Sequence, residues 1–199
     1  GGRITRNKVW FYGALRRRYR EDEVLNAFKP DGTPIVDQNT QWWHTEKVSY
    51  QASPSNRFIG FYQGLHTQES GRADELVAWE SREQKTVKPR YAKIQWEGLR
   101  GNSLIANVQF GVRRYPRGVD ILGSGVGRRD LVTERITGDV IVAGEDQFTK
   151  KDNTVGSLTW YKPNWFHGNH EFKFGADHSN DFESPGLAPK PQNYHLIYN

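Results

Sequence analysis

Alternation of hydrophobic and polar residues is the clearest pattern in this chain. In the stretch 104–115, LIANVQFGVRRY, the first alternate set is apolar and consists of Leu104, Ala106, Val108, Phe110 and Val112. The second set, which begins at Ile105, is polar from its second member onward. Because a β-strand points successive side chains to opposite faces of its sheet, this stretch predicts a strand with one apolar and one polar face.

Six further segments have strand-like patterns and β-favouring composition. They are residues 8–20, 43–53, 57–67, 91–99, 153–161 and 170–178. The segment 194–199, YHLIYN, reads as the beginning of an eighth strand, and the one helix-like segment is REDEVLNAF at 20–28. Strand signals of this density predict an all-β protein.

The connections between these segments alternate in length. Short linkers rich in Pro, Gly, Asn and Ser occupy 54–56, 100–103 and 162–169, as tight turns require. Long polar connections occupy 21–40, 68–90 and the region between residue 115 and residue 153. In an up-and-down meander this order places short turns at one end and long loops at the other. Outer-membrane barrels have that asymmetry, and about 9 to 11 tilted residues cross a bilayer.

We therefore predict an antiparallel up-and-down transmembrane β-barrel segment of about seven to eight strands. The residues expected to face lipid share the apolar register, and they are Val48, Tyr50, Ile94, Trp96, Leu104, Ala106, Val108, Phe110, Leu158, Trp160, Phe172 and Phe174. Charges such as Lys47, Lys93 and Lys173 fall in the opposite register. A soluble sheet with one face on a core gives the same alternation.

Aromatic residues gather where the predicted strands begin or end. Trp10 and Tyr12 open the first strand, Trp42 and Trp43 precede the second, and Trp165 lies in a short linker. Because amphipathic rings concentrate at the headgroup level of membranes, we expect them to form interfacial belts.

The composition fits a sheet with little enclosed core. Hydrophobic residues make up 35%, the mean hydropathy is −0.83, and aromatic residues make up 13%. Disordered chains are poor in aromatic residues. Without cysteine, disulfides and thiolate metal sites are excluded. No apolar run reaches the 18 residues of a helical membrane span.

No motif for catalysis, cofactor binding or nucleic-acid binding stands out. The net charge of +5 is modest, and we interpret the basic run LRRRYR at 15–20 as the end of a strand that faces solvent or the lumen. His167 and His170 have H-x-x-H spacing but lie in a turn, so we expect polar turn residues instead of a metal site. The glycine-rich stretch 123–127, GSGVG, lacks the Lys-Ser/Thr end of a phosphate loop. We assign no catalytic, cofactor, metal or ligand-binding residue.

Three stretches resemble the TonB-dependent outer-membrane receptors, in particular the large branch with a carboxypeptidase-regulatory-like domain before the plug. GGRITRNKVWFYGALR at 1–16 resembles an entry into their barrel strands. EKVSYQASPSNRFIGFYQ at 46–63 and NTVGSLTWYKPNWFHGNHEFKFGADH at 153–178 are similar to their later hairpins. The likeness runs from residue 1 to about residue 178 and rests on strand and turn patterns.

This resemblance implies a 22-stranded barrel with an N-terminal plug. Such a receptor imports a bulky ligand, for example a siderophore, cobalamin, a glycan or a peptide, and the TonB complex supplies energy through the plug. The chain shows neither a plug nor a closing strand, so we expect residues 1–199 to be an internal barrel segment in the bacterial outer membrane. The expected partners are outer-membrane lipid, the imported ligand and, through the plug, the TonB complex.

Two other functions remain open from the sequence. One is a small closed outer-membrane barrel, either a structural protein or an enzyme, which needs a complete eighth strand near the end of the chain. The other is a soluble carbohydrate-binding β-domain, in which the seven Trp residues would serve as sugar platforms.

Overall fold

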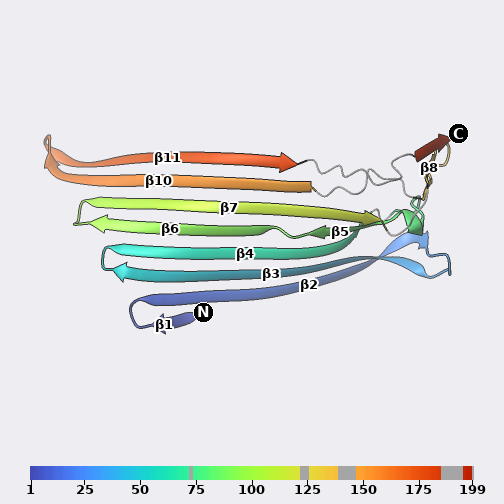
Figure 1. The fold of residues 1–199 in the computed structure, drawn as a ribbon, viewed down its shortest axis with the longest axis horizontal. Helices are drawn as coiled ribbons and strands as arrows, with labels where there is room; N and C mark the ends of the chain where they lie inside the picture. The colour runs from blue at the N-terminus through green and yellow to red at the C-terminus, as the bar shows by residue number, and fades with distance from the viewer. Residues whose placement is uncertain (72–73, 122–125, 139–146, 185–194, 199) are drawn as a thin grey trace.

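The structure, a computed structural model, describes residues 1–71, 74–121, 126–138, 147–184 and 195–198. A nine-stranded sheet dominates it, and a three-stranded sheet lies at one end (Figure 1). The large sheet contains β1 (Gly2–Thr5), β2 (Val9–Phe28), β3 (Pro34–Ser53), β4 (Asn56–Gly71), β5 (Glu83–Val87), β6 (Arg90–Arg100), β7 (Leu104–Ile121), β10 (Gln147–Trp165) and β11 (Gly168–Ser184). The small sheet contains β8 (Gly127–Asp130), β9 (Ile136–Thr137) and β12 (His195–Tyr198), and a short 3₁₀-helix, η1, spans Trp79–Ser81.

The large sheet is an antiparallel meander, as the sequence predicts. Every neighbouring pair of strands in it is antiparallel. The short connections at 6–8, 54–55, 101–103 and 166–167 all lie at one end, which we call the short-turn end (Figure 1). We call the opposite end, where the small sheet lies, the distal end.

Strands β5 and β6 form one continuous strand position. Both lie between β4 and β7, and the register with each neighbour runs through them without a shift. The backbone N–H of Lys88 donates to Pro116 O at 3.0 Å, and Leu65 N–H donates to Pro89 O at 3.0 Å. Pro89 lacks a backbone N–H and removes only one hydrogen-bond donor. It therefore separates β5 from β6 without disturbing the pairing of this strand position with β4 and β7.

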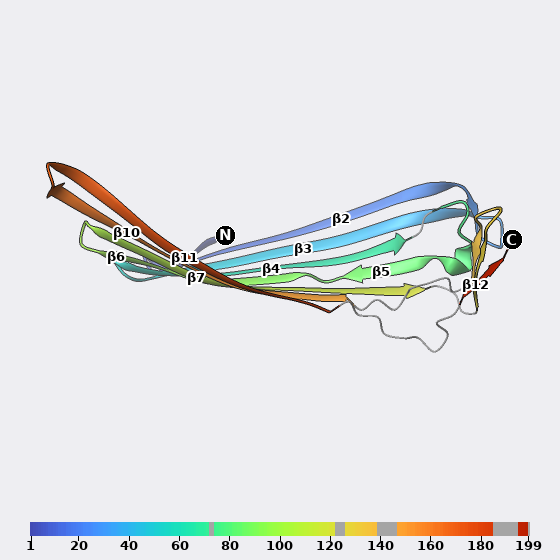
Figure 2. The same ribbon diagram turned by 90° about the horizontal axis from the view of Figure 1, so that it is seen from above.

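Most of the large sheet is a single twisted layer (Figure 2). The accessible surface is 13544 Å², whereas a compact monomer of 23.0 kDa exposes about 9,600 Å². The buried hydrophobic residues among the described ones are Ala27, Ile35, Ile59, Val77 and Val119. A core this small does not cover a nine-stranded sheet, since a sheet normally buries one face against a second layer.

The helix-like segment 20–28 is the end of strand β2, and that prediction is therefore wrong. Residues 20–23 pair with residues 36–39 of β3, and the chain turns only at 29–33. Asp31 and Gly32 make this turn: Asp31 Oδ1 accepts the Thr33 N–H at 3.0 Å, and Gly32 has a φ of 81°. The predicted long loop at 21–40 is thus mostly a long hairpin, because cross-strand pairing overrides a weak local helix preference.

The possible eighth strand does not join the large sheet. Residues 195–198 form β12, which pairs in parallel with β8 at the distal end. The two other long connections are confirmed only in part. Residues 68–90 contain the end of β4, η1 and β5, and the connection after β7 contains β8 and β9.

Candidate functional site

All twelve residues predicted to face lipid lie on one face of the large sheet. Directly opposed residues of an antiparallel pair share a face, so the register assigns each side chain. We call a set of directly opposed residues on adjacent strands a row. One row crosses five strands and consists of Val48, Gly60, Ile94, Phe110 and Thr154. The neighbouring rows contain the other nine predicted residues, which are Tyr50, Trp96, Leu104, Ala106, Val108, Leu158, Trp160, Phe172 and Phe174.

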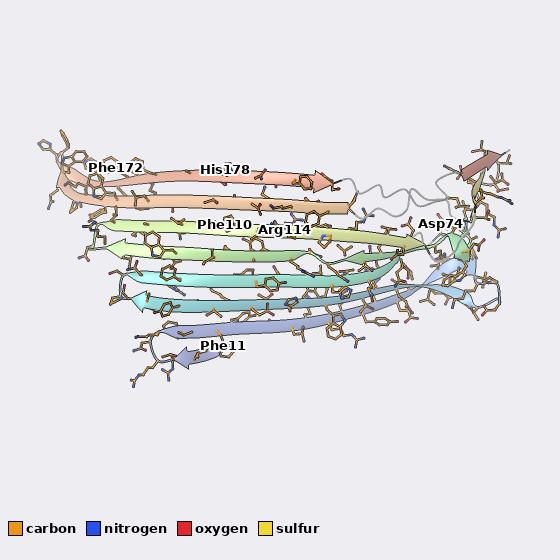
Figure 3. The ribbon with its side chains drawn as sticks, in the orientation of Figure 1. Phe11, Asp74, Phe110, Arg114, Phe172 and His178 are labelled. Atoms are coloured by element: carbon orange, nitrogen blue, oxygen red, sulfur yellow. The ribbon has the colours of Figure 1, made fainter. Side chains whose placement is uncertain are left out.

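We call this surface the apolar face, and its part nearest the short turns the apolar band. The band consists of the apolar-face residues within 9–15, 48–52, 56–62, 92–98, 104–112, 154–160 and 172–176. None of them is Asp, Glu, Lys or Arg, and the charged residue Glu46, directly opposite Gly13 and Tyr62 on the same face, marks the distal border of the band on β3. Figure 3 shows Phe11, Phe110 and Phe172 on three separate strands of this half of the sheet.

Large hydrophobic side chains of the band are open to solvent. Ile94 and Phe174 are each 58% exposed, and Phe110 and Val108 are each 44% exposed. No described element covers this face. A contiguous apolar surface of this extent marks an interaction with protein or membrane.

Charged residues bound the band on its central strands. On β6 the apolar-face residues Arg90 and Arg100 stand ten positions apart, and on β10 Asp152 and Lys162 do the same. Ten residues of antiparallel strand extend about 33 Å, which becomes about 25 Å along a barrel axis at a tilt near 40°. That height equals the apolar band of outer-membrane barrels.

Aromatic rings line the short-turn border of the band. Trp165 contacts Phe166, His170 and Phe172, with ring centroids between 4.9 and 5.8 Å apart. The Trp160 ring lies 5.7 Å from Phe172. These residues make a compact aromatic cluster around the β10–β11 turn, where the sequence predicts an interfacial belt.

Trp96 is held in place from both sides. Its indole Nε1–H donates to Asn56 Oδ1 at 3.0 Å, and its ring lies so close to Gly98 that a Cβ there would stand 2.5 Å from Trp96 Cζ2. Gly98 thus provides the space that lets the ring lie flat along its own strand. The indole presents an apolar body to the band and a satisfied polar group to its border.

The opposite face, which we call the polar face, carries a hydrogen-bonded network. Lys93 Nζ donates to Gln95 Oε1 at 3.1 Å, Gln95 Nε2 donates to Glu97 Oε1 at 2.9 Å, and Arg57 pairs with Glu97 at 3.7 Å. Ser49, at 6% exposure, also lies on this face. The polar side chains crowd and pair with one another, as on the inner side of a curved sheet.

A shallow pocket lies on the polar face farther toward the distal end. Trp43, Leu65, Tyr91 and Arg113 are among its lining residues. Arg16 stacks on Trp43, with its Cζ 5.2 Å from the ring centroid. Aromatic rings beside guanidinium groups can bind flat or anionic ligand groups, but the sequence pattern did not single out this pocket.

The distal end contains a buried charge that the sequence analysis missed. Arg82 is 1% exposed, and its Nη2 donates to Asp74 O at 3.1 Å. Burial lowers the pKa of Arg82, whereas the charges of Asp37 and Asp74 oppose that shift. Burial raises the pKa of Asp37, and Arg82 acts in the opposite direction. Nothing in the local sequence around Arg82 indicates this burial.

The described residues contain no cluster of His, Cys, Asp or Glu suited to a metal ion. His170 lies against Trp165 and Phe172 as part of the aromatic cluster. Most of the glycine-rich stretch 123–127 lies outside the described residues. No described helix is long and apolar enough to span a membrane.

Comparisons with protein-family models, with curated proteins and with solved structures find no match to this chain.

Proposed function

We propose that this chain is part of the barrel of an outer-membrane TonB-dependent receptor that imports a bulky ligand. The observation that carries the membrane part of the proposal is the exposed apolar band, with no charge inside it and charges at its borders. The receptor part rests on the sequence resemblance of the three strand-and-turn stretches. In this arrangement the apolar face contacts lipid and the polar face lines the lumen.

The energetic argument favours lipid over water at the apolar face. Apolar surface gains about 25 cal/mol per Å² when it leaves water, and no described element provides that cover. A soluble carbohydrate-binding domain would need a second layer over Ile94, Phe110 and Phe174. Their exposure supports the membrane proposal over that alternative.

Strand direction favours a segment of a larger barrel over a small closed one. Six antiparallel steps separate β2 from β11, so these two long strands run in the same direction. An antiparallel barrel closes only with an even number of strands. β1 pairs with β2 over four residues at most, and β12 belongs to the small sheet. Closure therefore requires at least one more long strand.

Site-directed spin labelling tests the membrane part, because residues 1–199 contain no cysteine; any cysteine elsewhere in the full-length protein is first replaced by serine. The full-length protein is reconstituted in phosphatidylcholine vesicles with labels at Val108 or Phe174, and at Gln109 or Lys173 as polar-face controls. We expect the first pair to be accessible to oxygen and shielded from a water-soluble nickel reagent, and the second pair to show the reverse. Equal nickel access on both faces would refute lipid contact.

A further inference from the structure

A row of cations crosses the apolar face just beyond the distal border of the apolar band. Arg90 on β6, Arg114 on β7 and Lys150 on β10 are directly opposed in the sheet register. They stand on three adjacent strand positions, and Lys88 lies two residues before Arg90 on the same face. Figure 3 shows Arg114 beyond Phe110 along β7, toward the distal end.

This arrangement is unfavourable without an anionic partner, because like charges directly opposite each other destabilise a sheet. Asp152 forms ion pairs with two cations of the row: its Oδ1 lies 2.9 Å from Arg114 Nη1, and its Oδ2 lies 2.9 Å from Lys150 Nζ. Arg90 and Lys88 are exposed and have no ion-pair partner among the described residues. Four cations and one carboxylate leave a local net charge of +3.

The surroundings of the row indicate what the missing anion is. Toward the short turns lies the charge-free band, with Ala92 and Val112 as the nearest apolar-face residues of β6 and β7. Beside Lys150, in the same row, stands Phe182, which is 54% exposed. A ligand that fits must therefore join negative groups to a long apolar body. Free phosphate has the charge but nothing for the band to contact.

We propose that the row of Arg90, Arg114 and Lys150 binds the phosphate groups of anionic lipids in the leaflet nearest the distal end. This proposal rests on the proposed membrane function and adds a specific lipid contact to it. The acyl chains lie along the apolar band, and the phosphates reach the cations at its border. Guanidinium groups suit this role because they bind phosphate oxygens in bidentate geometry.

The test measures lipid binding by the full-length protein. Protein reconstituted with phosphatidylcholine containing phosphatidic acid is extracted, and retained phosphatidic acid is quantified by native mass spectrometry. The triple variant Arg90→Gln, Arg114→Gln, Lys150→Gln removes the row. Each cation near a charged membrane surface is worth roughly a fivefold change in binding, so we expect roughly a hundredfold weaker retention.

The matched control removes three cations from the polar face of the same strands: Lys93→Gln, Arg113→Gln and Lys151→Gln. We expect this triple to retain phosphatidic acid like the parent protein. The single variant Arg90→Gln changes a residue without an ion-pair partner, so it preserves the fold and should weaken retention about fivefold. Equal retention by the two triple variants would overturn the proposal.

Two further readouts separate the alternatives. Quenching of tryptophan fluorescence by brominated phosphatidylcholine reports band immersion independently of the row. If brominated lipid quenches the fluorescence but the two triple variants retain equal amounts of phosphatidic acid, the proposal for the cation row is refuted and the membrane function is not. If brominated lipid does not quench the fluorescence of the parent protein, the membrane function itself is refuted. Displacement of phosphatidic acid by inorganic phosphate at equal concentration would identify a free-anion site and refute the lipid assignment.

Discussion

An arginine at position 94 distinguishes a lipid-facing strand from a water-facing one. Ile94 is 58% exposed and stands four residues from Arg90 and six from Arg100. At about 3.3 Å per residue and a tilt near 40°, it lies about 10 Å inside one border of the band and about 15 Å inside the other. Position 94 is therefore close to the middle of the proposed hydrocarbon layer.

The expected cost of Ile94→Arg is about 2 to 4 kcal/mol in a bilayer, where the charge must leave water. If water covers the face, an exposed substitution of this kind changes the free energy of unfolding by no more than about 0.5 kcal/mol. The two cases differ by more than the experimental error of unfolding measurements. The assay is reversible guanidinium unfolding of the full-length protein into and out of phosphatidylcholine vesicles.

Two companion variants make the measurement a test of depth and of face. Val112→Arg places the charge two residues from Arg114 at the distal border, where the expected cost is about 0 to 1 kcal/mol. Gln109→Arg places it on the polar face, one residue from Phe110, and we expect little change. If Ile94→Arg and Gln109→Arg destabilise the protein equally, the assignment of the apolar face to lipid is refuted.

Three other substitutions test local features of the protein. Gly98→Ala puts a Cβ 2.5 Å from the Trp96 ring, whereas Gly156→Ala on the same face meets no atom within 4 Å. We therefore expect the first to lower the unfolding free energy by about 1 to 3 kcal/mol and to shift Trp96 fluorescence, and the second to do neither. Asp37 has a raised pKa, so its ionisation opposes folding at neutral pH, and Asp37→Asn should be more stable than the parent protein there. That difference should shrink as the pH falls through the pKa of Asp37, and a constant difference from pH 3 to pH 7 would contradict the burial argument.

The alternation of residue types by itself determined which side chains share a face of each strand, and the order of short and long connections predicted the meander. Period 2 fixes the two faces of each strand, and in an antiparallel meander directly opposed residues point the same way. The register therefore brings residues as distant as Val48 and Phe174 onto one surface, and the alternation had already predicted that both belong to the apolar face. Turn chemistry at 54–55 and 101–103 fixed where the strands reverse.

The tertiary structure alone decided how far the strands extend and what the distal end contains. Residues 20–28 have no strand pattern, and residues 20–23 are extended because residues 36–39 pair with them across the hairpin. The buried Arg82 interacts electrostatically with Asp37 on β3, which the sequence places 45 positions before it. The row of Arg90, Arg114 and Lys150 joins residues up to 60 positions apart. Each of these features arises from cross-strand register and packing, which a local pattern along one chain does not encode.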